Sequence, residues 1–199
     1  MVLTWVEESI ADAAEQLRFD EELLAAGQGV ARVWEIEREC VVLGRGGIPE
    51  RDVRGGAEIF RRESGGGAVA LAPGCLNYSL VIPFDAFPRC RDVSFSMRWI
   101  LGRMVRALDV PGLACAGISD LALHGRKVSG NAQHRTRGAI LHHGTLLYAF
   151  EGERAERLLA DPVRAPEYRA GRGHEEFLTN LPLERGEIVR RLRKEWCGE

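Results

Sequence analysis

The sequence lacks the features that mark a secreted, membrane-spanning or nucleic-acid-binding protein. Its 199 residues carry a formal net charge of −2, from 27 basic and 29 acidic side chains. We therefore expect neither nucleic acid nor an anionic membrane among its partners. No apolar run approaches the roughly 20 residues that cross a bilayer. The N-terminal segment MVLTWVEE has neither a basic start nor a long apolar stretch, so we expect no signal peptide and a cytoplasmic protein.

Cysteine is scarce, and its spacing suggests no pairing. The chain has five cysteines, an odd number, and no CxxC pair. A disulfide framework and a structural zinc site are therefore not expected. The sequence also lacks internal repeats, low-complexity stretches, a GK[ST] phosphate loop and a GxGxxG motif. We expect most of the thiols to be reduced and partly buried: Cys40, Cys75, Cys90, Cys115 and Cys197.

The patterns that are present predict a single α+β domain over residues 1–199. Hydrophobic residues make up 45% and charged residues 28% of the chain, as in ordinary globular proteins. Strand-like segments come in runs between a few helices, which favours a mainly antiparallel or mixed sheet with helices packed on its faces and argues against a Rossmann fold. Apolar periodicity and turn residues predict helices over 12–26, 92–108, 152–159 and 183–196, and strands over 30–36, 40–43, 59–62, 68–71, 76–82 and within 120–150.

The first chemical motif is RRESGGGAV, residues 61–69. Three consecutive glycines allow a ligand to approach the main chain closely, and their N–H groups can form an anion-binding nest. Arg61 and Arg62 directly before them add positive charge suited to phosphate or carboxylate. The alternative is a flexible turn between two strands.

The second motif is SDLALHGRKVSGNAQ, residues 119–133. A lysine flanked by small polar side chains is a candidate clamp for a phosphate or acyl phosphate. The alternative is a solvated lysine on an edge strand. If this segment is extended, Lys127, Ser129 and Asn131 point to one face, and Val128, Gly130 and Ala132 to the other.

The third motif is LHHGTLL, residues 141–147. Adjacent histidines on a strand point to opposite faces, so at most one of them faces a given site. No cysteine or carboxylate stands at ligand spacing, so we predict no metal site here. We expect a histidine held by hydrogen bonds beside a glycine turn.

Together these motifs resemble the lipoate–protein ligase A family, within the biotin/lipoate ligase superfamily. The family pattern is approximately RRxSGGGAV, a strand containing LN, a DL pair, a G(R/K)KxSG(N/S)A segment and HHGTLL. The chain matches it in order and spacing at 61–69, 76–79, 120–121, 125–132 and 142–147. The similarity extends from 20–24 through VLGR at 42–45 to TNL at 179–181, and so covers nearly the whole chain.

The resemblance implies a two-step ligase. Lipoate or octanoate and ATP would give an acyl-AMP and pyrophosphate, and the acyl group would pass to a lysine of a lipoyl carrier domain. Lys127 matches the family's key lysine, and Asp120 matches an acid near the adenylate and a candidate Mg²⁺ ligand. Val69 and Leu80 are expected to line the acyl tunnel. The full set of residues expected to contact acyl substrate or ATP is Arg45, Arg62, Ser64, Gly65, Gly66, Gly67, Asn77, Asp120, Lys127, Ser129, Gly130, Asn131, Ala132, His143, Gly144 and Thr145.

The chain departs from the family pattern in two ways. Leu71-Ala72-Pro73 stands where the family usually has His-Asp, and Gly74-Cys75 stands where it often has Gly-Asn. Larger family members carry a further small C-terminal domain, which we do not expect here. A separate accessory subunit is therefore one candidate partner, besides the carrier domain; the alternative is that the chain catalyses only part of the reaction.

Two other functions fit the same fold. Related acyltransferases pass octanoyl through a cysteine thioester without ATP, and Cys115 lies close to the position of their nucleophile, just before 119–123. The apolar stretch 113–116 argues instead for a buried, inert thiol at this position. The second alternative is a non-catalytic subunit that holds lipoyl domains, against which Lys127 and the intact glycine loop argue.

Overall fold

A computed structural model of the chain describes residues 2–6 and 12–198. Within them the strands form one seven-stranded sheet, in the order β1-β2-β6-β10-β9-β8-β7, and one three-stranded sheet, in the order β4-β3-β5. Only β1 with β2 and β3 with β4 pair in parallel among the described strands. The strands are β1 Thr4–Val6, β2 Val30–Trp34, β3 Cys40–Leu43, β4 Glu58–Arg61, β5 Val69–Leu71, β6 Cys75–Pro83, β7 Leu113–Ala116, β8 Asp120–Leu123, β9 Arg126–Arg135 and β10 Ala139–Leu147.

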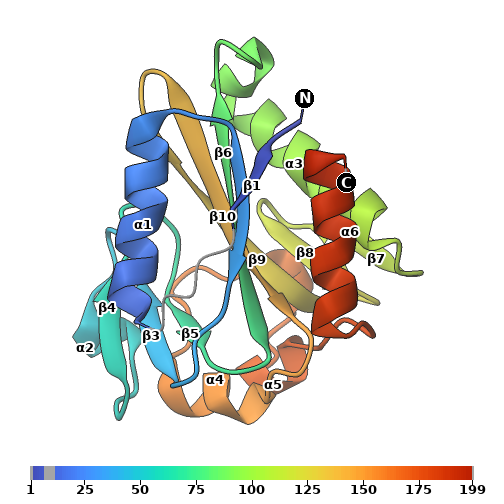
Figure 1. Cartoon of the computed structure of the whole chain (residues 1–199). Coiled ribbons are helices and arrows are strands. Elements are labelled where there is room, and N and C mark those ends of the chain that lie inside the picture. The colour runs from blue at the N-terminus through green and yellow to red at the C-terminus, as the bar shows by residue number, and fades with distance from the viewer. Residues whose placement is uncertain (1, 7–11, 199) are drawn as a thin grey trace.

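Helices cover both faces of the large sheet, with α3 and α6 on one side and α1 on the other (Figure 1). The predicted α+β class with a mixed sheet is thus confirmed, and every predicted helix is found within two residues of its expected ends. The helices are α1 Ala13–Ala26, α2 Pro49–Asp52, α3 Val93–Leu108, α4 Gly152–Leu158, α5 His174–Phe177 and α6 Arg185–Cys197, with short 3-10 turns at Pro88–Arg91 and Glu167–Arg169.

The main core lies between the large sheet and the pair α3 and α6. Asp92 caps α3 by accepting a hydrogen bond from the Phe95 N–H, at 2.5 Å. The apolar stripe that predicted this helix is buried, with Ile100 and Met104 packed against Trp196 of α6 and the strands beneath. This packing fixes strands β9 and β10, which carry several residues of the site.

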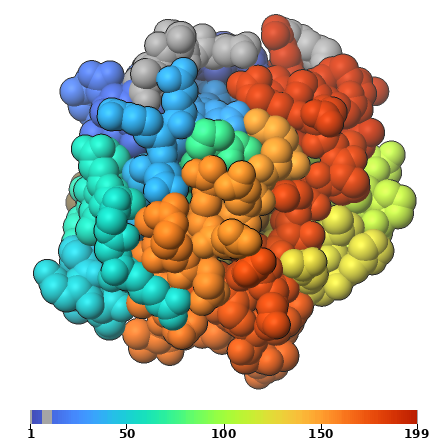
Figure 2. All heavy atoms as spheres, turned by 90° about the horizontal axis from the view of Figure 1, so that it is seen from below, coloured from blue at the N-terminus to red at the C-terminus, as the bar shows by residue number. Residues whose placement is uncertain are grey.

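The small sheet lies on the opposite side and forms a second core with α4. Arg54, after α2, binds Glu156 of α4 at 3.0 Å, and Val53 forms a bridge with Leu159. Figure 2 shows these two segments side by side on the lower face, in cyan and orange. The glycine-rich residues 64–67 join β4 to β5. The small sheet therefore carries the glycine loop, whereas the large sheet carries the lysine motif.

Strands β1 and β7 and the short helices α2 and α5 were not predicted. Each spans only three or four residues, too few for a hydrophobic period to appear. In the part of the chain that the structure describes, no helix is both long and apolar enough to cross a membrane.

Candidate active site

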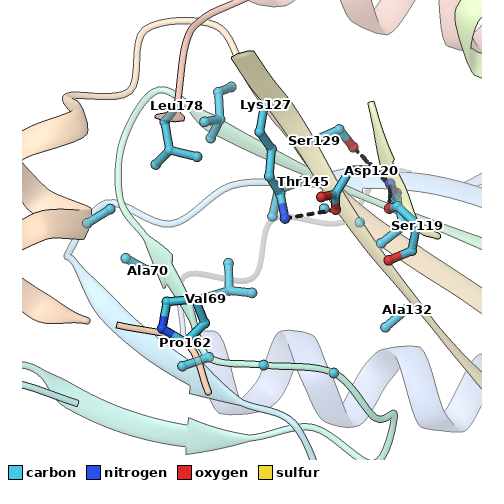
Figure 3. A pocket seen from close by; sticks show the side chains of 18 of the residues that line it. Val69, Ala70, Ser119, Asp120, Lys127, Ser129, Ala132, Thr145, Pro162 and Leu178 are labelled. Carbon is cyan, nitrogen blue, oxygen red and sulfur yellow. Dashed lines mark hydrogen bonds and ion pairs between the residues drawn. The ribbon is translucent and has the colours of Figure 1, made fainter. Parts of the chain in front are cut away.

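A cavity of about 820 Å³ opens between the two sheets. Its walls come from the glycine loop and β5 on one side and from β8, β9 and β10 on the other, and residues 162–169 lie across it. In Figure 3, Lys127 and Asp120 point toward each other across from Val69 and Ala70, with Pro162 at the edge. Much of the wall is apolar, contributed by Leu17, Trp34, Val69, Leu71, Leu147, Phe150 and Leu159. The cavity thus combines an apolar compartment with a polar end.

Lys127 is the cation at the polar end. Its Nζ lies 2.8 Å from Asp120 Oδ1, and its side chain is 27% exposed. The register between β8 and β9 shifts at this point, because Ala122 pairs with Lys127 while Leu121 pairs with Ser129. This bulge inserts one residue and reverses the alternation. The ammonium group therefore lies beside Gly130, where an added Cβ would be 2.8 Å from Nζ. The prediction that Lys127 shares a face with Ser129 and Asn131 is wrong for this reason.

Asp120 joins this lysine to the segment that crosses the cavity. Its Oδ2 accepts a hydrogen bond from the Tyr168 hydroxyl at 2.8 Å. Burial and the nearby carboxylate raise the pKa of Tyr168, so the hydroxyl keeps its proton. Arg172 holds the same segment by donating to the carbonyl oxygens of Gly125 and Tyr168. The irregular residues 161–173 thus form one wall of the site.

The glycine loop is held close to β3 by backbone packing. A Cβ on Gly44 would lie 2.3 Å from the carbonyl oxygen of Gly66, so only glycine fits at position 44. Arg62 braces the loop from beneath, with Nη2 donating to the carbonyls of Gly65 and Gly67 at 2.9 and 2.8 Å. Among the described residues no carboxylate pairs with Arg62, and burial lowers its pKa to about 10. Its charge therefore lies beside the cavity without a carboxylate partner, although its N–H groups already donate to Ser64 and to the carbonyls of Val42, Gly65 and Gly67.

His143 connects the glycine loop to the centre of the large sheet. Its Nε2 lies 2.6 Å from Ser64 Oγ, and its Nδ1 lies 3.8 Å from Asp20 Oδ2. Asp20 is fully buried, pairs with Arg32 at 2.9 Å and accepts a hydrogen bond from Ser79 at 2.6 Å. A rigid, buried ion pair therefore anchors the histidine that contacts the loop. His143 is held by hydrogen bonds as expected, but the glycine turn expected beside it is wrong, because Gly144 lies within β10 and pairs with Tyr78 and Asn131.

The cavity brings together most of the predicted site residues. Arg45, Ser64 and Gly65 do not line it: Arg45 is exposed, and Ser64 is buried beneath the loop. Leu80 is wrong as a tunnel residue, because it points into the core under α3. The predicted residues that do line the cavity are Arg62, Gly66, Gly67, Val69, Asn77, Asp120, Lys127, Ser129, Gly130, Asn131, Ala132, His143, Gly144 and Thr145.

Several lining residues were missed by the sequence analysis. Trp34 and Phe150 stand outside the motifs, although Phe150 follows the LHHGTLL motif by only three residues. Tyr168 lies in an irregular stretch with no periodicity. The length of that stretch, 161–173, was the available signal, because long loops in compact domains are often functional.

A family model of the lipoyl protein ligase A/B catalytic domain matches residues 12–190. The chain belongs to this family. It is 33% identical over 194 residues to an octanoyl-[GcvH]:protein N-octanoyltransferase of Kyrpidia tusciae, in an alignment that covers 79% of this chain and 66% of the relative. It is 37% identical over 95 residues to the lipoate-protein ligase LplJ of Bacillus subtilis, covering 47% of this chain and 27% of that one. The chain thus spans two thirds or less of the length of these relatives.

Solved structures share the fold. A bipartite lipoate protein ligase from Thermoplasma acidophilum superposes with a TM-score of 0.80 at 20% identity, covering 98% of this chain and 81% of that chain. A lipoate-protein ligase A bound with ATP also gives 0.80 at 20% identity, covering 98% and 84%. The family and fold expected from the motifs are therefore confirmed.

Asp120, the expected Mg²⁺ ligand, already has two protein partners. Both carboxylate oxygens are engaged, one by Lys127 and one by Tyr168. Among the described residues no group of three or more histidine, cysteine, aspartate or glutamate side chains is placed to hold a metal. A Mg²⁺ ion at Asp120 would therefore need Lys127 to turn away, and it would draw its other ligands from water and substrate phosphates.

Cys115 differs from the expected buried thiol. It is exposed on β7, opposite Leu121 of β8, whereas the other four cysteines are buried. Strand β7 is the last of the sheet, and no strand covers its outer edge in the described residues. Desolvation raises the pKa of the Cys115 thiol. The thiol is accessible, but it lies outside the cavity lining and its environment does not favour the thiolate.

Proposed function

We propose that the chain activates a lipoyl or medium-chain acyl carboxylate with ATP and transfers the acyl group to a lysine of a carrier domain. The observation that carries this proposal is the Lys127–Asp120 pair at the polar end of an apolar cavity, with the glycine loop and Arg62 opposite. The apolar walls suit an alkyl chain, and the two cations suit a carboxylate and a phosphate. We also propose that residues 1–199 act as one adenylating domain.

The proposed chemistry has two displacements. A carboxylate oxygen of the acyl substrate attacks the α-phosphorus of ATP, the bond to the β-phosphate oxygen breaks, and pyrophosphate leaves. The carrier lysine amine, after losing a proton, then attacks the acyl carbon, and AMP leaves. Lys127 and Arg62 would stabilise negative charge on the phosphate in the first step. When the anion binds, Lys127 can turn from Asp120 to the phosphate, while Tyr168 keeps Asp120 in place.

A second candidate is thioester transfer through Cys115, which the octanoyltransferase relatives favour. The thiolate would attack a carrier-bound octanoyl amide or thioester, release the first carrier, and pass the acyl group to a new lysine without ATP. The exposed position of the thiol supports this candidate. Its raised pKa and its place outside the cavity lining weigh against it.

Exchange of labelled pyrophosphate into ATP that requires added lipoate or octanoate separates the two candidates. With lipoate or octanoate present, we expect exchange in the wild type and in Cys115→Ala, and its loss in Lys127→Ala. Lys194→Ala is the matched control, because Lys194 is an exposed lysine on α6 and does not line the cavity. Transfer of preformed lipoyl-AMP to a lipoyl domain is measured alongside, since it tests the second step alone.

The opposite pattern would exclude the ligase. The chain is a transferase if two results are found together. Neither pyrophosphate exchange nor transfer from lipoyl-AMP occurs, and intact-mass analysis after incubation with an octanoylated carrier shows an octanoyl adduct that Cys115→Ala abolishes. If the chain only retains a lipoylated domain on a column, and gives none of these activities with a purified accessory subunit, it is a binding subunit.

A further inference from the structure

The first histidine of the HH pair belongs to a buried polar network on the far side of β10 from His143. His142 has no exposed surface and lies among the apolar side chains beneath α3. Burial and the neighbouring His143 lower the pKa of His142 to about 3. The ring is therefore neutral, with one nitrogen that donates and one that accepts.

The partners of the ring decide which nitrogen carries the proton. His142 Nδ1 lies 3.2 Å from Gln133 Nε2. The orientation of the Gln133 amide is itself fixed, because its Oε1 lies 2.9 Å from Nη1 of Arg135, and a guanidinium can only donate. Gln133 Nε2 must then donate to Nδ1, so the proton of His142 is on Nε2.

The same direction of hydrogen-bond donation continues to the wall of the cavity. His142 Nε2 lies 3.2 Å from the Tyr78 hydroxyl, which donates onward to Asn131 Oδ1 at 2.5 Å. With its oxygen occupied, the Asn131 amide donates through Nδ2 to the carbonyl of Ser119 at 2.8 Å. Every bond thus runs one way, from Arg135 near the surface to Ser119 in the cavity wall.

The last bond of this chain holds the turn that presents Asp120. Residues 117–119 join β7 to β8, and Asp120, the partner of Lys127, follows directly. The turn is also contacted from outside, since a Cβ on Gly117 would be 3.5 Å from the Tyr168 ring. Gly144 leaves room for the Asn131 amide, which any side chain at 144 would overlap. The turn therefore has an inner support in Asn131 and an outer one in Tyr168.

We propose that His142 and Tyr78 are positioning residues: through Asn131 they hold the 117–119 turn, and with it the Asp120–Lys127 pair, in the geometry that binds the reacting anion. This inference rests on the proposed function, since it names residues that prepare the same site. Arg135 and Gln133 fix the direction in which every hydrogen bond of this network donates. The network therefore holds the 117–119 turn in a single arrangement.

The decisive variant is Tyr78→Phe, which keeps the ring and removes the hydroxyl. Tyr148→Phe is the control, because it also removes a tyrosine hydroxyl that donates a hydrogen bond, here to Glu35 at 2.8 Å, and Tyr148 does not line the cavity. We expect kcat for whichever acyl donor the wild type uses to fall by roughly tenfold in Tyr78→Phe, with KM within about threefold. Tyr148→Phe should behave as wild type. His142→Gln, which can both accept and donate, should retain more activity than His142→Leu.

Two readouts need no turnover and therefore separate this inference from the proposed function. In ¹⁵N-histidine spectra, assigned by His142→Gln, we expect a ring protonated on Nε2 only, unchanged between pH 5 and 8. Cys115 adjoins the turn, so its rate of modification by a thiol reagent should rise severalfold in Tyr78→Phe and not in Tyr148→Phe.

Some outcomes would overturn the inference. An Nδ1-protonated or charged His142, or an unchanged Cys115 rate together with unchanged kcat in Tyr78→Phe, would show that the chain does not hold the turn. Loss of activity that simply follows a loss of thermal stability across all variants would assign the network to folding alone. Absent pyrophosphate exchange in the wild type would refute the ligase without affecting either readout.

Discussion

Replacing Gly44 with alanine tests whether the glycine loop must lie against β3. The added Cβ would be 2.3 Å from the Gly66 carbonyl oxygen and 3.1 Å from the Gly65 carbonyl carbon and oxygen. Contacts of this kind are not found below 3.0 Å, so the loop must retreat by the difference, about 0.7 Å. Displacements of about 1 Å at a reacting group cost on the order of 100-fold in rate. We therefore expect turnover to fall by roughly 10- to 100-fold.

The stability of this variant should change much less than its activity. Overpacking one methyl group costs about 1–3 kcal/mol, which for a domain of this size lowers the melting temperature by roughly 2–12 °C. Gly46→Ala is the control, because a Cβ there meets nothing within 4 Å and the φ of Gly46 is not in the left-handed region. Steady-state turnover and thermal melts are measured on both. Wild-type turnover in Gly44→Ala, or an equal loss in Gly46→Ala, would refute the reasoning.

Three further predictions follow from single contacts. Tyr168→Phe removes the bond to Asp120 and should raise KM for the acyl donor more than it lowers kcat, because it loosens a wall of the cavity; unchanged steady-state constants would contradict this. Because the pKa of His142 is lowered to about 3 in the folded protein, the unfolded chain binds a proton below about pH 6.5 that the folded chain does not. The free energy of unfolding should therefore fall on acidification by about 1.4 kcal/mol per pH unit for this group. Urea titrations of His142→Gln should show a shallower fall of the free energy of unfolding with decreasing pH. In the native protein, Cys115 should be the first thiol to react with a colorimetric reagent, and the other four should react only after denaturation. Rapid reaction of more than one thiol in the native protein would contradict the burial of those four.

The sequence patterns located the longer helices and strands and both halves of the site, but not the geometry of the site. The apolar stripe of α3 and the long strand segments of β6 and β10 are long enough to be read from the sequence. Lys127 and the glycine loop stood out because three glycines and an ordered set of motifs are rare by chance.

The remaining features depend on contacts between distant residues. The bulge that places Lys127 beside Gly130 arises from pairing with β8 and leaves no mark in the alternation of the segment itself. Cys115 looked buried because its neighbours are apolar, yet β7 is an edge strand that leaves the thiol exposed. Arg62 was expected to face the ligand, and it also supports the loop through carbonyls that only the folded loop turns toward it.

The division of the site between two sheets has a consequence for substrate size. Among the described strands no ladder joins the sheet of Val69 to that of Lys127. The width of the gap is therefore set by the apolar side chains packed between them, including Leu43, Leu71 and Leu147, and not by backbone hydrogen bonds. Changing the volume of these side chains would widen or narrow the gap without altering any polar group. Under the proposed function, the preference for acyl-chain length can therefore diverge in the interior of the fold while the reacting end stays the same.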